Sequence, residues 1–139
     1  MSSKPVSIAL YGRLAGDATL TALLATTTSI YSGRATQGSS YPYIVFGRAS
    51  QVRVARSFGT PGVDNDIWRV SAFVAGSDAQ PAENIDSRVA ELLDDYELTV
   101  TGHHNLWLAR ESGFRLVEDT DTGTVWQVGG EYRLTTEPA

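Results

Sequence analysis

The start of the chain has apolar residues at helical spacing. Leu10 and Leu14 lie four residues apart, and Pro5 precedes them where proline favours a helix start. Gly16 interrupts the pattern, and Asp17 is well placed to cap a following turn. The apolar residues of that turn are Leu20, Leu23 and Leu24. The pattern predicts two short helices or one kinked helix.

A second helical pattern begins after residue 76. Ser77 and Gln80 match a capping box, and Pro81 fits the first turn. The apolar positions that follow at helical spacing are Ile85, Val89, Leu92, Leu93 and Tyr96. The outward positions include Glu83, Asp86, Arg88, Glu91 and Asp95. We expect one face of this helix to pack on a sheet and the other to face water.

The middle of the chain reads as two strands. Residues 44–46 are β-branched or aromatic, and alternation continues over 48–56. Turn-forming residues fill 58–66. A second strand is then predicted, whose alternate residues on one face are Trp68, Val70, Ala72 and Val74. This predicts a long protruding β hairpin, preceded by a short extended piece at Ile30 and Tyr31.

The last 40 residues indicate an antiparallel meander. Extended segments are predicted at 98–100, 106–111, 114–118 and 124–128, with a hairpin turn at 121–123. Gly129 and Gly130 suggest a bulge or a close backbone approach. The order of elements predicts an α+β fold, a mostly antiparallel sheet with helices packed on one face. Residues 1–139 show no linker or repeat, so we expect one domain.

Composition narrows the class of protein. The chain has 139 residues, of which 42% are hydrophobic, enough for a self-sufficient core. It contains no cysteine, which excludes disulfides, thiolate metal sites and a cysteine nucleophile. No apolar stretch approaches the roughly 20 residues of a membrane span, and no secretory signal is recognisable at the N-terminus. We expect a soluble, unsecreted protein.

Charge is divided along the chain. Residues 1–63 hold six cations against Asp17 alone, net +5, whereas residues 64–139 hold five arginines against fifteen carboxylates, net −10. The overall charge of −5 argues against a general nucleic-acid binder. Ten of the eleven cations are arginine, the side chain preferred in interfaces, which favours protein contacts.

Signatures of catalysis are missing from the sequence. It has no dinucleotide fingerprint, phosphate loop, H-E-x-x-H or G-x-S-x-G motif. Residues 59–62 resemble a phosphate loop only in their glycines, since Lys4 is the only lysine. The acidic clusters at 94–97 and 118–121 end a helix and precede a turn, where solvated acids are common. We expect no catalytic residue and no cofactor.

Two adjacent histidines raise the question of a metal site. His103 and His104 would point to opposite faces of an extended chain, so both could not bind one ion. We expect them in a solvated turn after Gly102, and we expect no metal.

Three arginines mark the predicted hairpin. Arg48, Arg53 and Arg56 lie near the aromatic residues Tyr43, Phe46 and Phe58. Such a surface could bind single-stranded nucleic acid. The acidic remainder of the chain would repel phosphates, so an arm that docks on a neighbouring protein accounts better for both halves of the charge distribution.

The order and spacing of several segments give a family resemblance. They are 10–24, 30–31, 41–47, the strand with Trp68, 77–94, 98–102, and the closing hairpin with Trp126 and 132–134. In this order the sequence resembles the tail terminator, or tail-completion and head–tail joining, proteins of long-tailed bacteriophages. The resemblance covers nearly the whole chain, except that 48–64 matches no family pattern.

The resemblance implies a structural role in the virion without catalysis. Proteins of this kind form hexameric rings that cap the tail tube, end its polymerisation and present a surface to the head connector, leaving a channel for DNA. It implies a head-proximal place in the tail, assembly in the host cytoplasm, and the tube protein, the connector and further copies as partners. No membrane is involved.

A closed ring needs a heterologous contact between subunits. We expect the arginine-bearing hairpin to meet an acidic surface of the next subunit, with Phe58 adding apolar contact. The candidate residues are Arg48, Arg53, Arg56, Phe58, Glu91, Asp95, Glu118 and Asp119. The alternatives are a small ligand-binding or enzymatic α+β domain, with a pocket near Tyr96, Trp107 and the histidines, and another neck or baseplate component.

Overall fold

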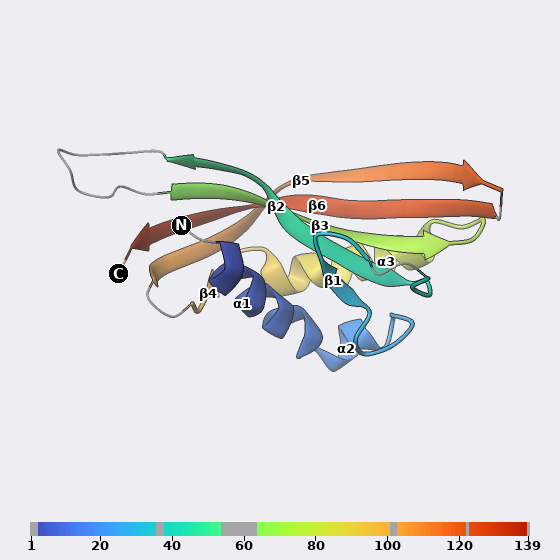
Figure 1. Cartoon of the computed structure of the whole chain (residues 1–139), viewed down its shortest axis with the longest axis horizontal. Helices are drawn as coiled ribbons and strands as arrows, with labels where there is room; N and C mark the ends of the chain where they lie inside the picture. The colour runs from blue at the N-terminus through green and yellow to red at the C-terminus, as the bar shows by residue number, and fades with distance from the viewer. Residues whose placement is uncertain (1–2, 36–37, 54–63, 101–102, 122, 139) are drawn as a thin grey trace.

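The protein is described by a computed structural model that covers residues 3–35, 38–53, 64–100, 103–121 and 123–138. The described residues form one six-stranded sheet and three helices (Figure 1). The helices are α1 (Ser3–Ala15), α2 (Ala18–Thr21) and α3 (Gln80–Leu93). The strands are β1 (Ile30–Ser32), β2 (Tyr43–Arg53), β3 (Asp64–Ala75), β4 (Tyr96–Leu98), β5 (His103–Thr120) and β6 (Gly123–Pro138). The predicted α+β class is confirmed.

The strands follow the order β1-β2-β3-β6-β5-β4. Only β1 and β2 are parallel, and the other neighbours pair antiparallel. The sheet is therefore mostly antiparallel, as the meander pattern predicts. The central strands β3 and β6 pair over their length, from Asp64 opposite Thr136 to Ala75 opposite Val125.

The core lies between the sheet and the helices, which Figure 1 shows on the same side of the sheet. The predicted parity of β3 is confirmed, since Trp68, Val70, Ala72 and Val74 are all buried. The predicted apolar face of α3 is confirmed as well, with Ile85, Val89, Leu92 and Leu93 buried. Leu10 and Leu14 of α1 are fully buried in the same cluster.

The entry into α2 follows the predicted cap. Asp17 is the N-cap residue, and its Oδ2 accepts a hydrogen bond from the Leu20 amide at 2.8 Å. The capping box predicted for α3 is wrong. Ala79 lies at the N-cap and makes no side-chain cap, while Asp78 Oδ1 accepts from the Gln80 amide at 3.0 Å. The acceptor for the Gln80 amide is therefore Asp78 and not Ser77.

Several predicted boundaries differ from the structure. Tyr96 belongs to β4 rather than α3, because the helix ends at Leu93. The two segments predicted at 106–111 and 114–118 are one strand, β5, whose pairing with β6 shifts register between Arg110 and Ser112. A bulge lets the strand continue past the irregular point, so a break in alternation does not end it.

The histidine pair does not lie in a turn. His103 and His104 begin β5, with Pro138 and Glu137 as their register partners in β6. Because these residues pair with the last residues of β6, β5 begins at His103. The hairpin turn predicted at 121–123 is confirmed, since Thr120 pairs with Gly123. The tip of the predicted β2–β3 hairpin, residues 54–63, lies outside the described residues.

Candidate assembly surfaces

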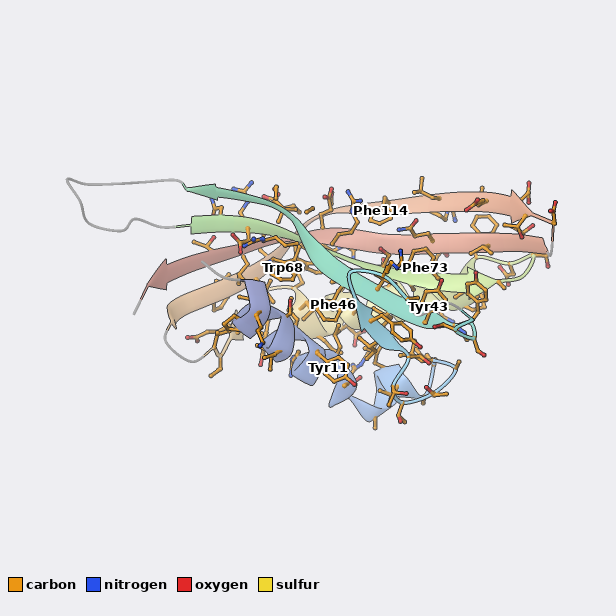
Figure 2. The ribbon with its side chains drawn as sticks, in the orientation of Figure 1. Tyr11, Tyr43, Phe46, Trp68, Phe73 and Phe114 are labelled. Atoms are coloured by element: carbon orange, nitrogen blue, oxygen red, sulfur yellow. The ribbon has the colours of Figure 1, made fainter. Side chains whose placement is uncertain are left out.

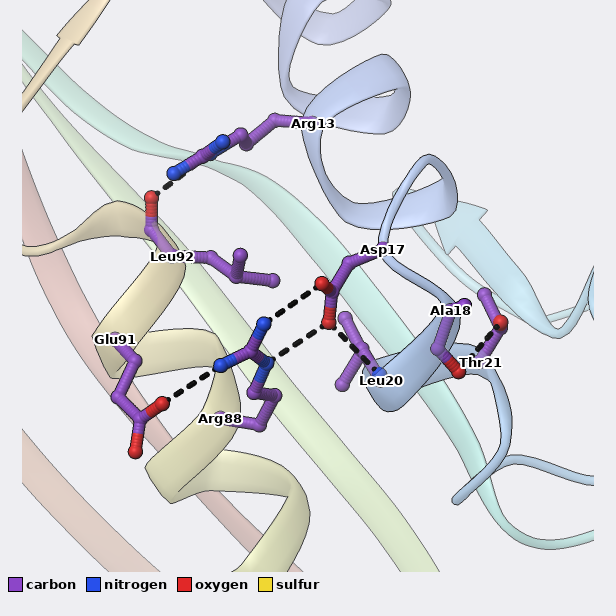
Figure 3. Close-up of polar contacts among 8 residues, drawn as sticks. All are labelled: Arg13, Asp17, Ala18, Leu20, Thr21, Arg88, Glu91 and Leu92. Carbon is purple, nitrogen blue, oxygen red and sulfur yellow. Dashed lines mark hydrogen bonds and ion pairs between the residues drawn. The ribbon is translucent and has the colours of Figure 1, made fainter.

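A network around Asp17 joins α2 to α3 (Figure 3). Arg88 donates from Nη2 to Asp17 Oδ1 at 2.7 Å and from Nε to Oδ2 at 2.8 Å, and its Nη1 donates to Glu91 at 2.7 Å. The hydrogen bonds from Arg88 lower the pKa of Asp17 to about 2. Since the same carboxylate caps α2 through the Leu20 amide, one side chain fixes two helices.

Arg13 makes a second link between helices. Its Nε donates to the backbone oxygen of Leu92 at 3.0 Å, in the last turn of α3, and its guanidinium lies 4.0 Å from the ring centre of Tyr96. A cation at a helix C-terminus satisfies a carbonyl that lacks an intrahelical partner and is favoured by the helix dipole. α1 is therefore held to the end of α3.

Arg110 forms the corresponding contact between β5 and α3. Its guanidinium donates to both oxygens of Asp86, at 3.0 and 2.9 Å, and to the Tyr132 hydroxyl at 3.0 Å. It reaches them across Gly130, where an added Cβ would lie 2.8 Å from the Arg110 Cζ. The close approach predicted at Gly129 and Gly130 is thus present, while the bulge lies opposite, in β5. Burial raises the pKa of Tyr132 to about 12.

The arginines of residues 64–139 are all paired within the chain. Besides Arg88 and Arg110, the pairs are Arg115 with Glu83 at 2.7 Å, Arg133 with Glu111 at 2.6 Å and Arg69 with Glu131 at 3.4 Å. Much of the charge on the outer face of α3 is therefore neutralised inside the subunit. Glu91, a predicted acceptor for a neighbour, already has Arg88.

The basic members of the predicted interface are only partly described. Arg48 is exposed in β2, with its Nη1 3.8 Å from Asp66 Oδ2. The backbone of Arg53 ends β2 opposite Asp64. Arg56 and Phe58 lie outside the described residues.

The acidic members fall into two groups. Glu118 and Asp119 are exposed near the end of β5, where Asp119 accepts from the Thr124 hydroxyl at 2.8 Å. Glu91 and Asp95 flank the end of α3, and Asp95 has a φ of 55° in the turn that follows. The register places Glu118 and Asp119 at one end of the sheet and Arg53 at the other end. β3, which spans this separation, is roughly 35 Å long at about 3.3 Å per residue.

The sheet face away from the core carries an aromatic cluster that the sequence analysis did not single out. Tyr43 stacks on Tyr41, with ring centres 5.1 Å apart, and on Phe73 at 5.2 Å, and Tyr31 meets Tyr43 edge-on. Figure 2 shows Tyr43 and Phe73 on neighbouring strands. Burial raises the pKa of Tyr43 to about 12. The sequence pattern that could have predicted this cluster is that residues 43–46 of β2 are apolar or aromatic at every position, so both faces of the strand carry apolar side chains.

Two cavities lie on this same face. One, of about 280 Å³, is lined by Gly33 and by residues of β2, β3 and β6 that include Val45 and Ser71. The other, of about 330 Å³, is lined by Leu116, Val117 and Val125 among others. Phe73 and Gln127 line both, so the hollows adjoin. Both hollows are shallow, and the lining of the first combines apolar residues with Arg48, Arg69 and Gln127.

The pocket considered for a ligand-binding domain is not formed by the residues proposed for it. Tyr96 pairs with Leu108 and packs against the core, whereas Trp107 pairs with Glu97 and is exposed. Neighbouring residues of a strand point to opposite faces, so the two rings lie on different sides of the sheet.

Neither a metal cluster nor a membrane span is found among the described residues. There, no three His, Asp or Glu side chains gather as a metal site would require. In the same part of the chain, no helix has the length and apolar character needed to cross a bilayer.

These features define a small α+β protein whose polar side chains mainly hold its own helices on a sheet. Residues 8–133 match the model of the tail completion protein gp17 family, and the chain belongs to this family. The family resemblance noted in the sequence is thereby confirmed. The protein is a structural component of a bacteriophage tail, which is a non-enzymatic role.

Two solved structures share the fold. A chain of the virion of a native gene transfer agent particle is 17% identical, with a TM-score of 0.69 over 95% of this chain and 94% of that chain. A second solved chain is 13% identical, with a TM-score of 0.60 over 100% of this chain and 99% of that chain. No curated protein sequence matches significantly.

Proposed function

We propose that the protein forms a homo-hexameric ring on the last ring of the tail tube. The ring ends tube polymerisation, offers the docking surface for the head connector and leaves a channel through which DNA passes without sequence recognition. Membership of the tail completion family over residues 8–133 carries this proposal. The chain acts as one domain at the head-proximal end of the tail, and assembly takes place in the host cytoplasm.

The subunit contact in this proposal joins unlike ends of the molecule. The end with Arg48 and Arg53, extended by residues 54–63 as a protruding arm with Arg56 and Phe58, meets an acidic surface of the next subunit. A head-to-tail contact of this kind is the type that closes into rings. The separation of Arg53 from Glu118 and Asp119 by the length of the sheet supports it.

Among the candidate acceptors, Glu118 and Asp119 are favoured over Glu91. Glu91 already accepts a hydrogen bond from Arg88 at 2.7 Å, so a neighbour would have to compete for it. Asp95 is exposed and stands next in order. Pairs of this type mainly set register and association rate, so apolar contact from Phe58 supplies much of the affinity.

Charge reversal tests the contact. Arg53→Glu together with Arg56→Glu should reduce the assembled mass in analytical ultracentrifugation, and added salt should weaken the unmodified assembly, because exposed charge pairs are screened. In a complementation assay the double variant should give tails of abnormal length. Arg34→Glu, a reversal at an exposed site elsewhere, serves as the matched control.

Two results would contradict the proposal. If the double variant forms rings and gives tails of normal length, the arm is not the subunit contact. If particles lacking the protein have tubes of normal length that still fail to join heads, the protein is a different neck component and does not end polymerisation.

A further inference from the structure

Both edges of the sheet are covered over a short length only. β1 pairs with β2 from Ile44 to Phe46, and β4 pairs with β5 from Leu106 to Leu108. In the part of the chain that the structure describes, no other strand pairs with the outer side of β2 or β5. Asp94 Oδ1 accepts from the Arg110 amide at 2.8 Å, which closes the covered part of β5. Residues 111–120 of β5 and 48–53 of β2 thus remain as open edges.

The open edge of β5 begins at a bulge and carries charges, yet it is long and exposes apolar side chains. Proteins commonly keep edge strands short or interrupt them with proline, charge or a bulge. This edge has no proline, and its two adjacent apolar side chains, Leu116 and Val117, are 57% and 55% exposed. Of its charges, Arg115 is held by Glu83 and Glu111 by Arg133. An exposed apolar pair, one on each face, fits an edge that another strand covers.

The two open edges are complementary in charge. Residues 48–53 contain Arg48 and Arg53 and no acid, whereas 111–120 contain Glu111, Glu118 and Asp119 against Arg115 alone. They also lie at opposite sides of the same sheet. An edge at one side of a subunit can therefore meet the other edge of the next subunit, with each subunit making the same two contacts.

We propose that residues 111–120 of β5 pair with residues 48–53 of β2 in a second copy of the chain, as antiparallel strands that continue the sheet from subunit to subunit. The proposal rests on the ring described above and specifies its main-chain contact. Successive pairs from β2 through β3 and β6 to β5 are antiparallel, so β2 and β5 run in opposite directions. A neighbour in the same orientation places its β2 antiparallel to β5.

The positions of the open parts of β2 and β5 also determine how far neighbouring copies are shifted along the strand direction. The open part of β2 lies toward Arg53, at one end of the sheet, and that of β5 lies toward Thr120, at the other end. Pairing them shifts the second copy along the strand direction, and a shift of this kind is what closed sheets require. In the antiparallel alignment, Arg48 comes toward Glu118 and Asp119 of the neighbouring copy, whereas Arg53 comes toward residues 111–113 and so toward Glu111.

Disulfide cross-linking tests the pairing against a clean background, because the chain has no cysteine. Ser50→Cys is combined in turn with Leu116→Cys, Val117→Cys or Glu118→Cys, which sample both faces of β5. Within one chain β2 and β5 are separated by β3 and β6, so about 14 Å lies between them, beyond the roughly 7 Å that a disulfide allows between Cα atoms. Any disulfide formed must therefore join two copies.

The expected result is a ladder of disulfide-linked species larger than dimers for at least one pair, seen under oxidising conditions and lost with reductant. Each single variant should give dimers at most. Ser50→Cys with Ser77→Cys, an exposed residue outside the sheet, should give no ladder. Far-ultraviolet circular dichroism identical to that of the unmodified chain establishes that each variant is folded.

Hydrogen exchange on the unmodified chain gives an independent measurement. The amides of residues 111–120 that point away from β6 should exchange at least tenfold more slowly in the assembled than in the dissociated protein. If sedimentation shows a ring but no pair cross-links and these amides exchange unchanged, the edge pairing is wrong while the ring stands. If no oligomer forms, alone or on tail tubes, both this inference and the proposed ring are contradicted.

Discussion

At the scale of single residues, the structure depends on polar side chains that serve more than one element. Asp17 caps α2 and receives two hydrogen bonds from Arg88 of α3. Its side chain is 16% exposed, so solvent weakens the pair only in part. A sequence pattern identifies the cap, because cap and helix are neighbours in the chain. The partner 71 residues away is assigned only by the fold.

The Asp17 carboxylate predicts a defined acid sensitivity. Its pKa in the folded protein is about 2, below its ordinary value of 3.8, so its stabilisation is present above about pH 4 and lost as pH falls toward 2. Asp17→Asn keeps a capping oxygen but loses the charge, and should cost about 1 kcal/mol at pH 7. Urea unfolding at pH 7, 4 and 2.5 measures the difference, which should shrink with acid. A difference independent of pH would show that the charge contributes nothing.

Two glycines predict opposite responses to an added methyl group. A Cβ at Gly130 would lie 2.8 Å from Arg110 Cζ and 2.9 Å from the Ser112 backbone oxygen, so Gly130→Ala should cost about 1–3 kcal/mol. At Gly12 in α1 nothing lies within 4 Å, and Gly12→Ala should add about 0.5–1 kcal/mol through helix propensity. The midpoint of urea unfolding measures both changes in stability. Equal shifts of one sign would refute the close approach at Gly130.

At the scale of elements, α3 is the helix that the sequence describes best. Its predicted apolar residues recur at helical spacing from Ile85 to Leu93, and all four are buried. β5 was the opposite case, since a register shift breaks its alternation and divided it into two predicted segments. Hydrophobic periodicity predicts an element reliably where the pattern is uninterrupted, as in α3. In β5 the pattern is interrupted, but pairing with β6 continues on both sides of the interruption.

The two faces of α3 predict a contrast between neighbouring residues. Leu93→Ala removes a fully buried side chain and should cost about 2–5 kcal/mol. Glu91→Ala removes an exposed partner of Arg88 and should cost less than about 0.5 kcal/mol. Chemical denaturation of the two variants at pH 7 compares them directly. Comparable losses would mean that the helix packs through a different face.

At the scale of the whole molecule, the division of charge along the chain has a different meaning in three dimensions. The acidic half contains five arginines, and all of them pair with carboxylates of the same subunit. Net charge by segment gives the sign of each region, whereas the fold decides which charges are already used.

The whole protein is also expected to contain no bound metal. His103 and His104 are neighbours in β5, and adjacent strand residues face opposite sides of a sheet. Elemental analysis of protein purified without chelators should find no metal in stoichiometric amount. Zinc or iron at one per chain that disappears on changing both histidines to alanine would contradict this expectation.

The sequence by itself determined the α+β class, the existence of a helix within residues 77–96, the cap at Asp17 and the resemblance to tail-completion proteins. Each of these depends on local spacing or on the order of segments, which a linear sequence preserves. Only the tertiary structure decided that Arg110 crosses Gly130 to reach Asp86, that Glu91 is paired with Arg88, and that β2 and β5 have edges that no other described strand covers. These depend on strand order and register, which bring distant residues together through pairing that no local pattern specifies.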